Sequence, residues 1–135
     1  MISPVVLWPA LAWLTIIPLA VANGALRQFV LAPRFGIRTA QPISGVLLMV
    51  AIAAVAWLLV GRLGSRHMQV WIAIGAAWFV ATVAFEFGMG ATSGKSWAEM
   101  LASYRFTDNN IWPLVLVWVA CAPAVLALVR RPTIP

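Results

Sequence analysis

Four long apolar runs constrain the fold of this chain more than any other feature. They extend over residues 5–22, 43–60, 68–87 and 111–129, and each approaches the roughly 20 residues that a helix needs to cross a bilayer. Apolar residues make up 64% of the 135-residue chain and charged residues only 9%, too few to cover the surface of a soluble globule. The sequence therefore predicts an all-α bundle of four transmembrane helices that forms a single membrane domain over residues 1–135.

Prolines and arginines mark the ends of these runs. Pro33 is predicted to stop the helical segment that follows the first run, and Pro42 to open the second at a first-turn position. Arg62 closes the second run, and Arg130 and Arg131 close the fourth. The predicted spans therefore end where their cations can meet the headgroup layer.

The first run also has a second interpretation, as a cleaved signal peptide. Ala20, Val21 and Ala22 have the small-x-small form of a cleavage site, but the positively charged segment that begins such a peptide is missing. A retained transmembrane helix is therefore the favoured interpretation.

The nine Lys and Arg residues lie at or beyond the ends of the apolar runs. Against three acids they give a net charge of +6, and in these positions they can contact lipid phosphates. We therefore expect the lipid bilayer to be the main partner, and no nucleic acid. Other membrane subunits, or further copies of this chain, are the expected protein partners. Four of the cations fall on one face of the membrane and five on the other, so orientation stays open.

Small residues recur at a spacing of four on two of the predicted helices. They are Ala73, Ala77 and Ala81 on the third, and Ala120 and Ala124 on the fourth. Such stripes let membrane helices approach closely, so they are predicted to be packing surfaces.

A short amphipathic helix is predicted over residues 96–104, between the third and fourth spans. Ser96 and Glu99 have the spacing of a capping box, and Trp97 and Tyr104 begin and end a run of apolar residues at helical spacing. Such a segment lies at the interface as an anchor or folds over the bundle as a lid, and the anchor is the favoured interpretation.

Glu86 is the one acidic residue inside an apolar run. An ionisable group near lipid is expected to have a partner, and Arg27 is the nearest cation in depth, with Asn23 as an additional donor. We therefore predict an ion pair between Glu86 and Arg27, in preference to a carboxylate that handles protons or ions. With four spans, the polar residues gather on one face, and the candidate polar cluster there consists of Asn23, Arg27, Glu86, Lys95, Trp97 and Tyr104.

The chain offers no set of residues with recognisable catalytic, metal or cofactor chemistry. Cys121 is the single cysteine and His67 the single histidine, so the Cys and His ligands of a typical metal site are missing. The segment from Gly90 to Ser96 is one residue short of a phosphate-binding P-loop and does not follow a strand. We therefore expect neither an enzyme nor a bound cofactor.

The chain resembles an uncharacterised family of small bacterial four-helix integral membrane proteins. The likeness covers most of the chain and rests on the pattern NGxLR, FExG, GKxW, Y and W, which is carried by Asn23, Gly24, Leu26, Arg27, Phe85, Glu86, Gly88, Gly94, Lys95, Trp97, Leu101, Tyr104 and Trp112, together with Pro33, Gly36 and Pro123. It departs from the family at residues 105–108, where an Asn-rich turn would be expected. The resemblance brings no activity, substrate or cofactor. From the four apolar runs we expect a multi-pass protein of the cytoplasmic (inner) membrane.

Three classes of function follow from these features. A non-catalytic accessory or scaffold subunit of a membrane assembly is favoured, because no continuous polar stripe crosses the predicted spans. The alternative is a small oligomeric transporter or channel that uses Glu86, with Arg27 as its counter-ion. An intramembrane enzyme ranks third, because no catalytic set is present.

Overall fold

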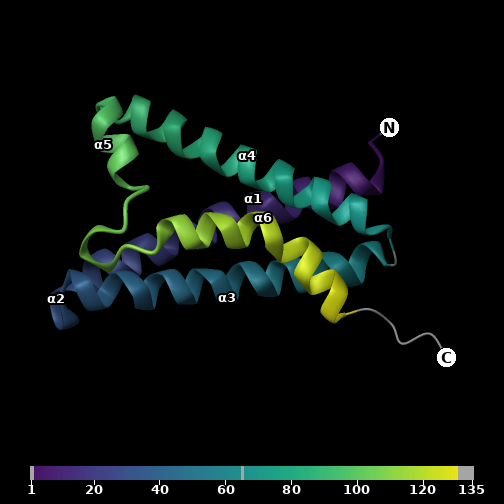
Figure 1. Cartoon of the computed structure of the whole chain (residues 1–135), viewed down its shortest axis with the longest axis horizontal. Coiled ribbons are helices and arrows are strands. Elements are labelled where there is room, and N and C mark those ends of the chain that lie inside the picture. Colours follow the sequence, from purple (N-terminus) through teal and green to yellow (C-terminus); the bar gives the residue numbers. More distant parts are fainter. Residues whose placement is uncertain (1, 65, 131–135) are drawn as a thin grey trace.

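The computed structural model describes residues 2–64 and 66–130, which form helices joined by short connections (Figure 1). Four helical stretches are long and apolar enough to cross a membrane: Pro4–Phe35, Ile37–Leu63, Met68–Thr92 and Trp112–Val129. This confirms the predicted all-α bundle of four spans and indicates a multi-pass membrane protein. Arg131, predicted to close the last span, lies outside the described residues.

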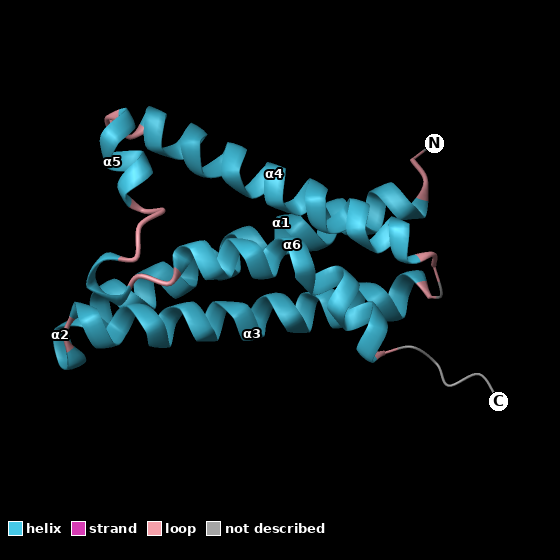
Figure 2. Cartoon of the chain, viewed as in Figure 1, coloured by secondary structure: helices cyan, strands magenta, loops and turns pink. Residues whose placement is uncertain are grey.

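The first stretch contains three consecutive elements, and each of the other three is one helix. It comprises α1 (Pro4–Leu26), the π-helical segment η1 (Arg27–Leu31) and α2 (Ala32–Phe35). The remaining spans are α3 (Ile37–Leu63), α4 (Met68–Thr92) and α6 (Trp112–Val129). The connection between α4 and α6 holds the short helix α5 (Trp97–Ala102) and the 3-10 turn η2 (Thr107–Asn109), as Figure 2 shows.

Helix α6 packs against both α3 and α4, and α1 packs against α3. Toward α5, α4 diverges from α3 and α6 (Figure 1). The buried apolar core therefore concentrates in the half of the bundle away from α5. Its buried side chains in that half include Leu59, Trp71, Ile74 and Trp78.

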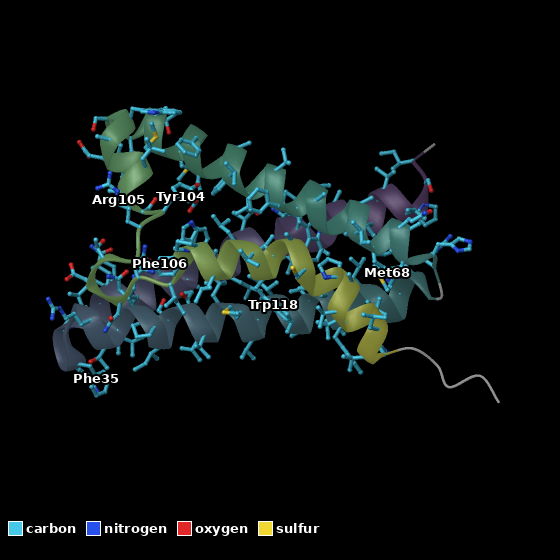
Figure 3. The ribbon with its side chains drawn as sticks, viewed as in Figure 1. Phe35, Met68, Tyr104, Arg105, Phe106 and Trp118 are labelled. Atoms are coloured by element: carbon cyan, nitrogen blue, oxygen red, sulfur yellow. The ribbon has the colours of Figure 1, made fainter. Side chains whose placement is uncertain are left out.

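Indole groups link neighbouring helices inside the bundle. Trp78 Nε1 donates to the carbonyl oxygen of Pro9 at 3.0 Å, and Trp13 Nε1 donates to Thr82 Oγ1 at 3.0 Å, so both bonds join α1 to α4. Trp118, between α6 and α3 in Figure 3, donates to the carbonyl of Met49 at 2.9 Å. Because a buried indole N–H without a partner is costly, these bonds fix how the helices meet.

Helix α3 begins at Ile37, earlier than the predicted start of the second span at residue 43. Pro42 was predicted to open the helix but lies inside it. A proline there has no N–H for the carbonyl of Arg38, four residues earlier. The side-chain amide of Asn109 donates to that carbonyl instead, at 3.1 Å, and so supports the early start.

The first helical stretch continues past Pro33, which was predicted to stop it. In η1 the chain makes the wider π-type turns, and the N–H of Ala32 bonds to the carbonyl of Arg27. Pro33 then stands in the first turn of α2, where its missing N–H is not needed. The stretch ends at Gly36, whose φ of 81° favours glycine.

Helix α5 is shorter than the predicted segment 96–104. Its start is as expected, because the Ser96 hydroxyl caps it by accepting from the backbone N–H of Glu99 at 3.2 Å. It ends at Ala102, and Tyr104 turns back toward α4. The helix is therefore shorter than predicted, but the rings of Trp97 and Tyr104 still share one side, because both pack against Phe87.

The close approach of α4 and α6 occurs at a glycine outside the predicted alanine stripe. A Cβ on Gly75 would overlap the backbone carbonyl oxygen of Ala120. Ala73 and Ala77, predicted as packing residues, are exposed at the surface of the bundle. The spacing of the alanines is right for a helix face, but it is a different face of α4 that contacts α6.

Candidate functional site

A cleft of about 730 Å³ lies at the end of the bundle where α4 diverges. All four spans contribute to its lining, and so do α5 and the turn that follows it. This volume falls within the range of about 300–1,000 Å³ that small-molecule sites occupy. The polar wall includes Asn23, Arg27, Ser44, Glu86, Lys95 and Tyr104, and the deeper lining is apolar.

Glu86 is the centre of a hydrogen-bond cluster in this cleft. Its Oε2 accepts from the Tyr104 hydroxyl at 2.8 Å and from Trp112 Nε1 at 2.9 Å. Figure 3 shows Tyr104 between the end of α4 and the start of α6. The cluster therefore joins the last turns of α4 to the long connection and to the first turn of α6.

The local sequence explains why Tyr104 reaches Glu86. After the Ser96 cap turns the chain, Met100 packs close to Gly90, where a Cβ would overlap its sulfur. The rings of Phe87 and Tyr104 then stack with their centroids 5.7 Å apart and an interplanar angle of 7°. This aromatic contact orients the hydroxyl toward the carboxylate of the residue that precedes Phe87.

The predicted ion pair between Glu86 and Arg27 is wrong. Among the residues described, the one ion pair within 4.0 Å joins Arg38 to Asp108 at 3.5 Å, at the surface. Arg27 lines the same cleft but belongs to η1, 14 residues after Trp13, whose ring contacts that of Phe85, the neighbour of Glu86. Because Trp13 contacts both Thr82 and Phe85, Glu86 is level with the middle of α1, and the prediction that Arg27 is its nearest cation in depth does not give a contact.

Asn23 bonds to α3 and not to Glu86, which corrects its predicted role as an added donor. Its side-chain oxygen accepts from the hydroxyl of Ser44, which is completely buried. The bond satisfies a polar group inside an apolar helix and holds α1 against α3. Asn23 therefore shapes the wall of the cleft.

The two remaining candidate residues have different positions. Lys95, on the connection, lines the cleft and lies within electrostatic reach of Glu86. Trp97 is 65% exposed, packs its ring 5.2 Å from that of Phe87, and does not line the cleft. The structure thus brings five of the six candidates to one cleft and leaves Trp97 outside it.

Sequence reasoning missed Trp112 and Ser44 as parts of this site. Trp112 was noted as part of the family pattern, and its hydrogen bond to Glu86 depends on a path of the connection that residue spacing does not reveal. Ser44 carried a usable signal, because a hydroxyl inside an otherwise apolar run requires a hydrogen-bond partner.

The arrangement supplies hydrogen-bonding and charged groups to a membrane-edge cleft. Both hydrogen bonds to Glu86 end on Oε2, so the carboxylate has acceptor capacity left for another group. Within residues 2–64 and 66–130, no three His, Cys, Asp or Glu side chains gather as a metal site requires.

In comparisons with known proteins, the chain matches no family model, no curated protein and no solved structure.

The pKa of Tyr104 provides a test of this cluster. Burial raises the pKa of Tyr104 above its usual value of about 10, and the hydrogen bond to Glu86 and the charge of Glu86 raise it further. Below pH about 10 the phenol is neutral in both the folded and unfolded states, so it causes no pH dependence. As the pH rises further, the unfolded state ionises first, and we expect stability to fall.

Tyr104 is the only tyrosine, so the phenolate absorbance reports this residue alone. We expect the folded protein in detergent to show no phenolate at pH 11, where the unfolded chain does. The Glu86→Gln variant should ionise at lower pH, because the negative charge is removed. Half-ionisation of the native protein near pH 10 would contradict the hydrogen bond.

Proposed function

We propose that this protein is a non-catalytic accessory or scaffold subunit of a membrane assembly, with the cleft as a binding site at one membrane face. One observation carries the proposal: the polar lining ends inside the bundle. Beyond Thr82 the helices are closed by buried apolar side chains, among them Trp71, Ile74 and Leu59. A path for solutes across a membrane needs polar or water-filled lining throughout, which this packing interrupts.

The links between helices support the same proposal. The bonds from Trp78 to Pro9 and from Trp118 to Met49 connect α1 with α4 and α3 with α6. Sliding of these helices would break buried hydrogen bonds, so the bundle is suited to a fixed framework. The exposed aromatic rings of Trp97 and Phe106 lie at the cleft end and suit contact with another subunit or with lipid headgroups.

The test is co-purification of the tagged protein at native expression level in a mild detergent. We expect a second membrane polypeptide in fixed stoichiometry, and we expect Trp97→Ala to reduce its recovery. Leu128→Ala, at an exposed position near the opposite end of the bundle, is the matched control and should retain the partner. Recovery of this chain alone under all conditions would overturn the accessory role.

A second candidate is a small oligomeric transporter that uses Glu86, with Arg27 as counter-ion. It is favoured by one observation: Glu86 faces the cleft with one carboxylate oxygen outside its hydrogen bonds and forms no ion pair with the other residues that the structure describes. In liposomes, this function predicts a pH-dependent flux that Glu86→Gln abolishes and that Glu99→Gln, on the exposed helix α5, leaves intact. Absence of flux in the unmodified protein would eliminate the transporter.

A further inference from the structure

The cleft has the polarity profile of one lipid leaflet. Its lining includes the buried apolar side chains Ile16, Leu48, Ile52 and Val115, whereas its charged side chains, Arg27, Glu86 and Lys95, are partly or fully exposed. A ligand that matches both parts carries an apolar chain and a polar headgroup. This profile favours an amphiphile over a fully water-soluble solute.

The rim presents two opposite charges that do not neutralise each other. Glu86 accepts only from the neutral groups Tyr104 and Trp112, and Arg27 forms no ion pair within the described part of the chain. Both side chains line the same cleft. Because unpaired charges at a membrane edge are costly, a ligand carrying both an ammonium and an anionic group would stabilise the site more than one with a single charge.

The structure also offers lateral access from the bilayer. Helices α1 and α4 meet where the rings of Trp13 and Phe85 lie 6.3 Å apart. Beyond this contact α1 continues to Leu26, while α4 diverges toward α5 (Figure 1), and no hydrogen bond of the described residues joins the two helices there. Ile17 and Ala20 of α1 and Phe85 and Met89 of α4 line the cleft, so we expect an acyl chain to lie between these two helices.

We infer that the cleft binds a zwitterionic phospholipid, with its ammonium on Glu86 and its phosphate on Arg27. Lys95 also lines the cleft, within electrostatic reach of Glu86, and is exposed enough to contact the phosphate oxygens of a bound lipid from the solvent side. An anionic lipid without an ammonium would place its negative charge near the carboxylate of Glu86, so its affinity should be lower. This inference rests on the proposed function, because it takes the cleft as a binding site and not as a transport path.

The test measures lipid binding to the purified, delipidated protein by native mass spectrometry and by thermal shift. Phosphatidylethanolamine and phosphatidylglycerol with identical acyl chains are compared with water-soluble phosphoethanolamine. We expect phosphatidylethanolamine to bind about tenfold more tightly than phosphatidylglycerol, which corresponds to one charge-assisted hydrogen bond. The soluble headgroup should bind far more weakly, because it leaves the apolar lining empty.

Two variants test which side chain contacts the ammonium of the lipid and which contacts its phosphate. Glu86→Gln keeps an acceptor for Tyr104 and Trp112 and should abolish the preference between the two lipids. Arg27→Gln removes a side chain that forms no ion pair within residues 2–64 and 66–130, and it should weaken binding of both lipids about tenfold. Glu99→Gln and Arg34→Gln, at exposed positions outside the cleft lining, are the controls. They should change neither the preference for phosphatidylethanolamine nor the affinity for either lipid.

Equal affinity for the two lipids, or a preference that survives Glu86→Gln, would overturn the inference. Binding of phosphoethanolamine as tightly as the lipid would also overturn it, in favour of a soluble ligand. Because these measurements use the isolated chain, they are independent of partner recovery. A partner without lipid preference refutes only this inference, and lipid preference without a partner refutes only the accessory role.

Discussion

Replacing Gly75 with alanine is expected to destabilise the bundle by about 3 kcal/mol, near the upper end of the usual range for overpacking. The new methyl group would overlap the backbone carbonyl oxygen of Ala120, which cannot move aside as a flexible side chain can. Helices α4 and α6 would have to separate, and the buried contacts of Trp71 and Val119 would loosen with them. In detergent micelles, circular dichroism should record a fall in melting temperature of about 10 °C.

Gly88→Ala is the matched control on the same helix. A Cβ there has no neighbouring atom within 4 Å, so the substitution adds no clash. Because alanine favours helix over glycine, this variant should be unchanged or more stable by up to about 1 kcal/mol. Equal melting temperatures for the two alanine variants would contradict the close approach of α4 and α6.

Glu86→Leu is expected to lower stability by about 2–3 kcal/mol, because two hydrogen-bond donors lose their shared acceptor. The Tyr104 hydroxyl and Trp112 Nε1 both donate to Glu86 Oε2, and the leucine side chain has no atom that can accept a hydrogen bond from them. The connection between α4 and α6 should then detach from the bundle. Thermal unfolding and limited proteolysis within residues 93–110 measure the global and local effects.

Two further variants separate this cluster from the ion pair suggested by the sequence. Glu86→Gln retains an acceptor oxygen and should lose less stability than Glu86→Leu. Arg27→Gln should leave stability nearly unchanged, since Arg27 forms no ion pair with Glu86. If Arg27→Gln lowered stability as much as Glu86→Leu, the result would support an ion pair between Arg27 and Glu86 and contradict the hydrogen-bond cluster.

The protection of Glu86 by neutral donors explains how a carboxylate is accommodated at this position. Phenol and indole groups each combine an apolar ring with one hydrogen-bond donor, so they pack against helices and still satisfy a charge. Tyr104 does both, since its ring stacks on Phe87 while its hydroxyl bonds to Glu86. A guanidinium in the same place would have required more desolvation.

The sequence by itself determined the four spans and the gathering of polar residues at one end. Both follow from the transfer of apolar side chains into lipid, which depends on the composition of each run and not on its neighbours. The hydroxyl cap of α5 was equally predictable, because Ser96 and Glu99 interact across three residues of one segment. Local chemistry was sufficient in each of these cases.

The tertiary structure decided which of these groups meet. Pro42 leaves the carbonyl of Arg38 without its usual donor, and this carbonyl accepts from Asn109, 71 residues further along the chain. This contact supports a start of α3 at Ile37, earlier than the sequence predicted. Likewise Glu86 bonds to Tyr104 and Trp112 and not to Arg27, because α4 diverges at the end where they were expected to pair. The approximate extent of each span follows from its own sequence, but the relative shift, rotation and lateral separation of the helices arise only when their side chains pack together.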